Sequence, residues 1–268
     1  MKRISSAILV AALALAFAGT VIAAPLQGGT LDPTKVPKYV TPLAVPGVMP
    51  ATSTDTALDY YEIVVRQFAQ QILPSGYPAT TVWGYGSVNH PGTFHYPALS
   101  IEAVVDKPVR VKWINDLKDP VTGNFLPHLL PVDQTLHWAN PPQTCVDEMT
   151  GTPYTGTDCR SLNPARYLGP VPIITHLHGA HVGPNSDGYP EAWYLPKANN
   201  ILAGFATEGK EYDDIFGGSG RGEGFAVFEY PNDQRATTLW FHDHSLGMTR
   251  VNVYAGPAGY YLLRGGAG

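Results

Sequence analysis

Short segments in which apolar and polar residues alternate constrain the fold of this chain most strongly. A period of two places one face of a strand against a core and the other in solvent, as in Val109-Arg110-Val111-Lys112-Trp113. Glycine and proline are abundant, at 28 and 25 of 268 residues, and turn residues separate the segments. We therefore predict an all-β fold, an antiparallel sandwich or barrel, with strands at residues 60–68, 80–85, 99–105, 109–114, 173–178, 225–230, 237–242 and 259–263.

Two long connections separate these segments. The first runs from about residue 115 to 170 and holds both cysteines, and the second runs from residue 179 to about 224. Loops of this length usually carry function or protect a sheet edge. Residues 24–57 are rich in Pro, Thr and Val without periodicity, and we predict that they form an extended N-terminal arm.

The composition restricts the classes of function. Apolar residues make up 44% of the chain and charged residues 15%, which is enough to build a core and too apolar for a disordered chain. The formal net charge of -5 argues against nucleic acid as a partner, because phosphate contacts require clustered Lys and Arg.

The first 23 residues have the layout of a secretory signal peptide. Lys2 and Arg3 form a basic start, residues 7–18 are apolar, and the residues up to Ala23 fit the cleavage rule. A membrane anchor is the alternative, but the apolar run is shorter than the roughly 20 residues that span a bilayer. We expect cleavage after Ala23 and export to the periplasm, the cell surface or the medium, with no membrane attachment of the mature chain.

The sequence contains two cysteines, Cys145 and Cys159, in a segment rich in Pro, Thr and Asp. In an oxidising compartment such a pair most simply forms a disulfide that pins a long surface loop. Copper ligation by one thiolate is the alternative, but neither cysteine has a histidine beside it. We therefore predict the disulfide.

Two His-x-His pairs, His176 with His178 and His242 with His244, each lie at the end of a predicted strand. Side chains at i and i+2 of a strand point to the same face about 7 Å apart, so a pair can chelate one ion or reach two adjacent ions. Imidazole suits zinc, copper, iron or nickel and does not choose among them. One such pair is weak evidence, but two on strand ends indicate a metal site. The other histidines are interpreted as surface or loop residues: His90, His95, His128, His137 and His181.

Several segments around the two pairs share the pattern of a known family. They are His176-Leu177-His178-Gly179, Trp240-Phe241-His242-Asp243-His244, Thr249-Arg250-Val251-Asn252-Val253-Tyr254-Ala255-Gly256, Trp83-Gly84-Tyr85, Val111-Lys112-Trp113-Ile114-Asn115 and Ser186-Asp187-Gly188-Tyr189-Pro190-Glu191-Ala192-Trp193. Together they resemble the first domain of bacterial multicopper oxidases, in the spore-coat laccase and bilirubin oxidase branch. The resemblance implies a Greek-key β-sandwich or barrel of the cupredoxin (plastocyanin-like) type, with residues 58–266 as domain 1.

The resemblance also implies a role for each ligand. In that family the first histidine of the first pair binds the type 2 copper, which is the position of His176. His178 and His242 correspond to ligands of one type 3 copper, and His244 corresponds to a ligand of the other. Asp187 matches an acidic residue thought to deliver protons during oxygen reduction. The alternative to this proton-delivery role is that Asp187 is a loop aspartate that caps a turn.

The implied activity is that of a laccase-like oxidase, which couples one-electron oxidation of phenolic or similar donors to four-electron reduction of O2 to water. The implied partners are O2, a small reducing substrate and further cupredoxin domains, in the same chain or a second one. Each ligating histidine also needs a partner for its other ring nitrogen, and we expect backbone carbonyls or a carboxylate such as Asp243.

The sequence departs from the family pattern at its far end. In the family a last domain supplies the remaining cluster histidines and a His-Cys-His segment that leads to the type 1 copper, and no cysteine lies between histidines here. We therefore expect type 2 and type 3 ligands only, and no turnover by this chain alone. Three interpretations remain: the N-terminal part of a longer oxidase, which is favoured, one subunit of a split oxidase, or an exported non-catalytic copper-binding module. A zinc hydrolase is less favoured, because neither pair has a general-base Glu in the usual place.

Overall fold

The computed structural model describes residues 31–212 and 218–266, so the predicted signal peptide lies outside the described residues. The chain divides into two compact units, Met1–Pro37 and Lys38–Gly268. The described part of the first unit has one 3-10 turn, η1 (Pro33–Lys35), which begins at the capping carboxylate of Asp32. Within the described residues, no helix combines the length and the hydropathy that a membrane span requires.

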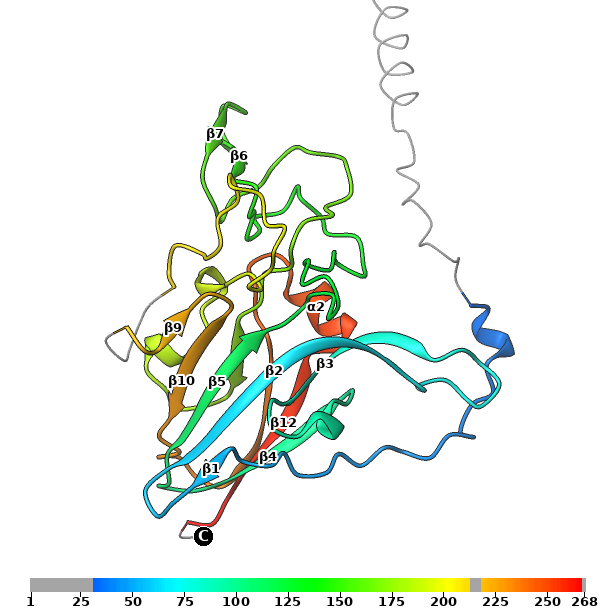
Figure 1. Cartoon of the computed structure of the whole chain (residues 1–268), viewed down its shortest axis with the longest axis vertical. Helices are drawn as coiled ribbons and strands as arrows, with labels where there is room; N and C mark the ends of the chain where they lie inside the picture. Colours follow the sequence, from blue (N-terminus) through cyan, green and yellow to red (C-terminus); the bar gives the residue numbers. More distant parts are fainter. Residues whose placement is uncertain (1–30, 213–217, 267–268) are drawn as a thin grey trace, which may run out of the picture. The chain divides into compact units, whose positions relative to one another are not determined.

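Two β-sheets form the body of the second unit (Figure 1). The first sheet has the order β1-β2-β5-β10-β9, with β3 also paired to β2, and its strands are β1 (Ser53–Thr54), β2 (Asp59–Gln70), β3 (Thr80–Ser87), β5 (Val109–Asn115), β9 (Arg221–Gly222) and β10 (Phe225–Tyr230). The second has the order β4-β12-β11-β8, and its strands are β4 (Ala98–Val104), β8 (Thr175–His178), β11 (Thr237–Asp243) and β12 (Ala258–Arg264).

All eight predicted strands are confirmed, and the fold is an all-β sandwich of the cupredoxin type. The prediction of antiparallel sheets was wrong in part, because β2 pairs with β5 and β12 pairs with β4 in parallel. Alternation of polar and apolar residues fixes which side chains face the core, but it carries no information on the direction of a neighbouring strand.

Elements outside the two sheets are short. The first long connection contains a two-stranded ribbon, β6 (Thr144–Val146) and β7 (Pro153–Thr155), which lies beyond the ends of the main sheets (Figure 1). The disulfide between Cys145 and Cys159 is present and joins β6 to the segment that follows β7. One α-helix among the described residues, α2 (Thr249–Ala255), follows β11, and the remaining 3-10 turns are η2 (Pro91–Thr93), η3 (Pro184–Ser186) and η4 (Pro190–Ala192).

Aromatic side chains fill the space between the two sheets and determine which face of the second sheet is left for the site. The Phe241 ring of β11 lies 5.2 Å from the Trp113 ring and 5.5 Å from the Tyr85 ring, which come from the first sheet. Because successive side chains of a strand point to opposite faces, Trp240 and His242 point to the outer face of the second sheet.

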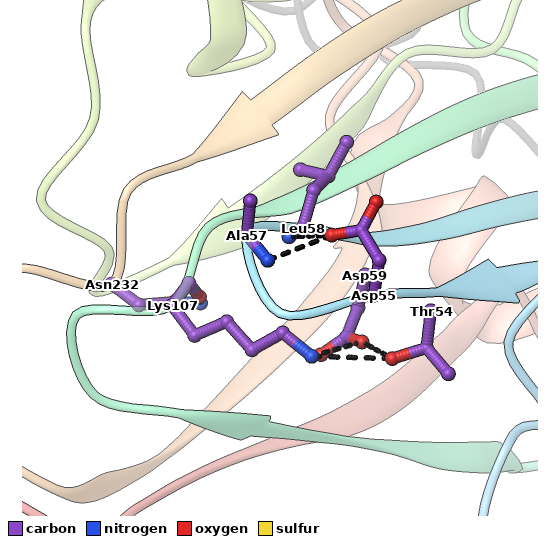
Figure 2. Close-up of polar contacts among 7 residues, drawn as sticks. All are labelled: Thr54, Asp55, Ala57, Leu58, Asp59, Lys107 and Asn232. Atoms are coloured by element: carbon purple, nitrogen blue, oxygen red, sulfur yellow. Dashed lines mark hydrogen bonds and ion pairs between the residues drawn. The ribbon is translucent and has the colours of Figure 1, made fainter.

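Polar contacts close the sandwich where β1, β2 and the β4–β5 turn meet (Figure 2). The Lys107 ammonium lies 2.6 Å from Asp59 and 3.2 Å from the Thr54 hydroxyl. The Asn232 amide donates to the Lys107 carbonyl at 2.7 Å, which adds the β10–β11 connection. The predicted N-terminal arm, residues 24–57, ends near these contacts. It contains the short strand β1, and its residue Met49 is buried.

Candidate metal centre

The paired strands β8 and β11 place the four predicted ligand histidines together. They run antiparallel, and their register sets His176 opposite His242 and His178 opposite Trp240. The backbone amide of His244 donates to the Ile174 carbonyl at 2.8 Å, which keeps the end of β11 beside β8. Ring centroids within the set His176, His178, His242 and His244 lie 4.8–5.7 Å apart for each measured pair.

A tight loop orients two of the imidazoles through backbone carbonyls. Nδ1 of His176 donates to the Asp187 carbonyl, and Nδ1 of His244 donates to the Gly188 carbonyl at 3.1 Å. Gly188 has a φ of +75°, and a Cβ at this position would lie 2.2 Å from the Thr175 carbonyl oxygen, so the loop needs glycine to approach β8. Because a carbonyl only accepts, both rings carry a proton on Nδ1, so Nε2 is the nitrogen through which the neutral ring would bind a metal.

The other two imidazoles, those of His178 and His242, face each other through different ring nitrogens. His242 donates from Nδ1 to the Asp243 carbonyl at 2.7 Å, and its Nε2 lies 3.4 Å from Nδ1 of His178. The Trp240 indole stacks on both rings, with centroids 4.0 Å from His242 and 5.4 Å from His178. The exposed His178 ring is thus oriented by packing, whereas the buried His242 ring is oriented by a hydrogen bond.

These nitrogens form one group suited to a metal ion. Among the described residues, His176, His178 and His242 alone offer three ligand atoms within 4.8 Å of one another. His244 adjoins this group through its ring, which stacks on His176. Burial lowers the pKa of His242 to about 4 and also lowers the pKa of His244, so both rings are neutral near pH 7. Neutral imidazole is the form that binds metal.

The carboxylate of Asp243 lies on the inner side of β11, away from the histidine rings. It accepts hydrogen bonds from the Ile174 amide, from the amide and hydroxyl of Ser245, and from the Asn252 side chain, at 2.8–3.1 Å. Burial raises its pKa to about 6. Backbone carbonyls therefore orient three of the four rings, and the carboxylate of Asp243 orients none of them directly.

Asp187, the predicted proton-relay residue, lies beside the cluster. Its Oδ1 is 3.4 Å from Nδ1 of His176, and its side chain is one-third exposed. It also ends the 3-10 turn η3, where its amide bonds to the Pro184 carbonyl. Asp187 thus lies both at the end of a turn and beside the cluster, and its role in proton delivery stays a prediction.

Among the remaining histidines, His128 is a loop residue and not a surface residue. Its side chain is buried, with 1% exposed, and it is hydrogen-bonded to Asn252 at 2.8 Å. No local pattern around His128 indicates burial, because its partner lies 124 residues further along the chain. His181, which was not predicted as a ligand, is exposed and lies near Asp233.

Comparisons with known proteins identify relatives of this chain. The chain is 33% identical to the laccase of Haloferax volcanii over 253 residues (93% of this chain and 34% of the laccase). It is 30% identical to the laccase of Bacillus subtilis over 226 residues (84% of this chain and 33% of the laccase). No protein-family model matches the chain.

Among solved structures, a multi-copper oxidase from Pediococcus acidilactici has the same fold. The two align with a TM-score of 0.50 at 19% identity, over 87% of this chain and 31% of that one. The chain spans about one third of the length of the curated relatives it matches. On the strength of these relatives, the chain belongs to the multicopper oxidase family.

Proposed function

We propose that this chain supplies half of the trinuclear copper cluster of a laccase-like multicopper oxidase. Such an enzyme couples one-electron oxidation of phenolic or similar donors to four-electron reduction of O2 to water. In this assignment His176 is a ligand of the type 2 copper. His178 and His242 are ligands of one type 3 copper, and His244 is a ligand of the other.

The observation that carries the proposal is the facing pair of nitrogens on His178 and His242. Two imidazole nitrogens bound about 2.0 Å from one tetrahedral metal ion lie roughly 3.3 Å apart. The separation between His178 Nδ1 and His242 Nε2 is 3.4 Å. The two rings thus already stand at the spacing that a single shared ion requires.

The donor set fits copper. All four side chains offer imidazole nitrogen, which suits copper ions in either oxidation state. When bound, the copper ions would supply the one-electron steps and the site of O2 reduction. The protein holds His176, His242 and His244 in fixed tautomers through carbonyl groups, so no proton blocks the Nε2 positions.

Asp187 is proposed to hold and pass protons at this site. Its carboxylate is in contact with solvent on one side and lies 3.4 Å from the His176 ring on the other. A carboxylate in that position can take a proton from water and release it toward the cluster, which oxygen reduction requires.

Further cupredoxin domains are the proposed partners of the face that carries the cluster, either in the same chain or in a second one. Trp240 and Tyr260, which are paired across β11 and β12, are 37% and 48% exposed on that face. Exposed aromatic residues next to an incomplete ligand set are typical of a surface that another domain covers.

Export is proposed as well. The disulfide between Cys145 and Cys159 supports it, because such bonds persist in oxidising compartments. The basic and apolar residues at the start of the sequence are the other support.

Copper binding by the 268-residue chain tests the ligand assignment. The purified chain would be loaded with Cu(II), desalted and analysed for bound copper, beside His178→Ala and His242→Ala. His181→Ala is the matched control, since this imidazole is exposed and outside the cluster. We expect the first two variants to lose copper and the control to retain it. Equal copper content in all of them would overturn the assignment.

Oxygen uptake with a phenolic donor tests the half-site argument. Four histidines provide too few ligands for three copper ions, so we expect the copper-loaded chain alone not to turn over. Sustained oxygen consumption that depends on the donor would contradict this expectation. A second chain that carries the remaining ligands would then be added. Oxygen uptake that appears only with both chains would favour the split oxidase over a non-catalytic copper-binding module.

A further inference from the structure

A chain of buried hydrogen bonds leads from the long β5–β6 connection to the metal centre. Nε2 of His128 lies 2.8 Å from Oδ1 of Asn252, a residue of α2. Nδ2 of Asn252 donates to Oδ2 of Asp243 at 2.8 Å and to the Pro172 carbonyl at 3.1 Å. Asn252 and Asp243 are fully buried, and His128 is 1% exposed.

The partners of each group determine which atom donates and which accepts in this series of hydrogen bonds. Nδ1 of His128 accepts from the Leu130 amide at 2.8 Å, so the ring carries its proton on Nε2 and donates to Asn252. Burial lowers the pKa of His128 to about 4, which keeps the ring neutral at pH 7. The Asn252 amide is thereby oriented with its oxygen toward His128 and its nitrogen toward Asp243.

At its Asp243 end, this series of hydrogen bonds connects the two strands that carry the ligands. Asp243 separates His242 from His244 in sequence, and its carboxylate accepts hydrogen bonds from the Ile174 amide and from Ser245. Ile174 directly precedes β8, which carries His176 and His178. Asp243 therefore ties the start of β8 to the turn after β11.

We propose that His128 and Asn252 are positioning residues of the metal centre, which hold Asp243 and through it the spacing of the two His-x-His pairs. This inference rests on the proposed copper site. Neither residue reaches the metal ligands directly. Their effect is exerted through the backbone on either side of Asp243, because both ligand-bearing segments are attached to its carboxylate.

The experiment measures Cu(II) binding to the full chain by competition with a chelator, together with the electron paramagnetic resonance spectrum. Asn252→Ala should weaken Cu(II) binding about tenfold or more and change the copper hyperfine coupling. Removing a side chain that helps to orient metal ligands typically has an effect of this size on metal affinity. His128→Leu removes the donor to Asn252 and should weaken binding in the same direction. His128→Gln should restore it, since its amide can donate to Asn252 and accept from Leu130.

Asn232→Gly is the matched control for a lost buried asparagine. Asn232 also makes two side-chain hydrogen bonds, to the Lys107 carbonyl and the Tyr261 hydroxyl, each at 2.7 Å. Its φ is +60°, so glycine adds no backbone strain. It lies before the start of β11, whereas the metal centre lies at the end of that strand.

The outcomes separate the two proposals. Weaker binding and an altered spectrum for Asn252→Ala and His128→Leu, with binding retained by His128→Gln and Asn232→Gly, support the inference. Unchanged binding and spectrum in folded Asn252→Ala and His128→Leu would overturn it, and so would an equal loss in Asn232→Gly. Failure of the unaltered chain to bind Cu(II) would overturn the proposed copper site and this inference with it.

Discussion

Gly188 is the position at which one added methyl group should disturb two ligands at once. Its carbonyl orients His244, and the carbonyl of the preceding Asp187 orients His176. Gly188→Ala would introduce a Cβ that lies 2.2 Å from the Thr175 carbonyl oxygen in the present backbone, so the loop must move outward by about 1 Å. Both orienting hydrogen bonds should lengthen as it moves.

The expected loss in the free energy of unfolding has two parts. An alanine at a φ of +75° costs roughly 1–2 kcal/mol relative to glycine. Overpacking against β8 adds about 1–3 kcal/mol. We therefore expect the free energy of unfolding to fall by about 2–5 kcal/mol, which is less than the stability of many domains. Because both carbonyls shift, Cu(II) affinity should fall by about 10–100-fold.

The assay is urea unfolding of the metal-free chain combined with Cu(II) competition. Gly151→Ala is the matched control, because Gly151 has a φ of +70° and no heavy atom within 4 Å of the added Cβ, so it isolates the backbone cost. We expect the control to lose only the backbone part and to bind Cu(II) normally. Equal unfolding free energies and equal Cu(II) affinities for the two variants would refute the orientation argument.

Three further predictions follow from ring stacking, from burial and from the disulfide. Trp240 stacks on His242, so Cu(II) should quench its fluorescence, and Trp240→Phe should abolish that quench; an undiminished quench would contradict the stacking geometry. His128 has a folded pKa of about 4 against 6.5 in the unfolded state, so the unfolded chain binds more protons between those values and stability falls as pH drops through them. His128→Leu should flatten that slope by up to about 1.4 kcal/mol per pH unit in urea titrations, and an unchanged slope would count against a buried neutral ring. Replacing Cys145 and Cys159 by alanine opens a loop with a sequence separation of 14, so the melting temperature should fall with a loss of about 3 kcal/mol, whereas equal melting temperatures would contradict it.

Main strands with one buried and one partly exposed face were predictable from the alternation of residues. In β5, buried and partly exposed residues alternate along the whole strand, so its limits could be read from the sequence. The ribbon β6–β7 could not be predicted in this way, since all three residues of β7 are exposed. Parallel pairing of β2 with β5 also escaped prediction, because pairing direction depends on the path of the connecting chain.

Of the candidate site, the residue types and their placement on one face were predictable, but the groups that orient them were not. Period-two spacing placed both imidazoles of each pair on one face, and the structure brings the two pairs together. The groups that orient them are backbone carbonyls, such as that of Gly188, which have no signature in the side-chain sequence. Burial of His128 was equally hidden, because it depends on Asn252 and on packing against Trp83, 4.7 Å away between ring centroids.

The location of bound copper tests the central claim most directly. Crystals of the chain grown with Cu(II) would be measured at the copper absorption edge, where anomalous scattering marks each ion. We predict copper within bonding distance of Nδ1 of His178 and Nε2 of His242, with further density at Nε2 of His176 or His244. Copper bound elsewhere, or bound to His242 through Nδ1, would contradict the account.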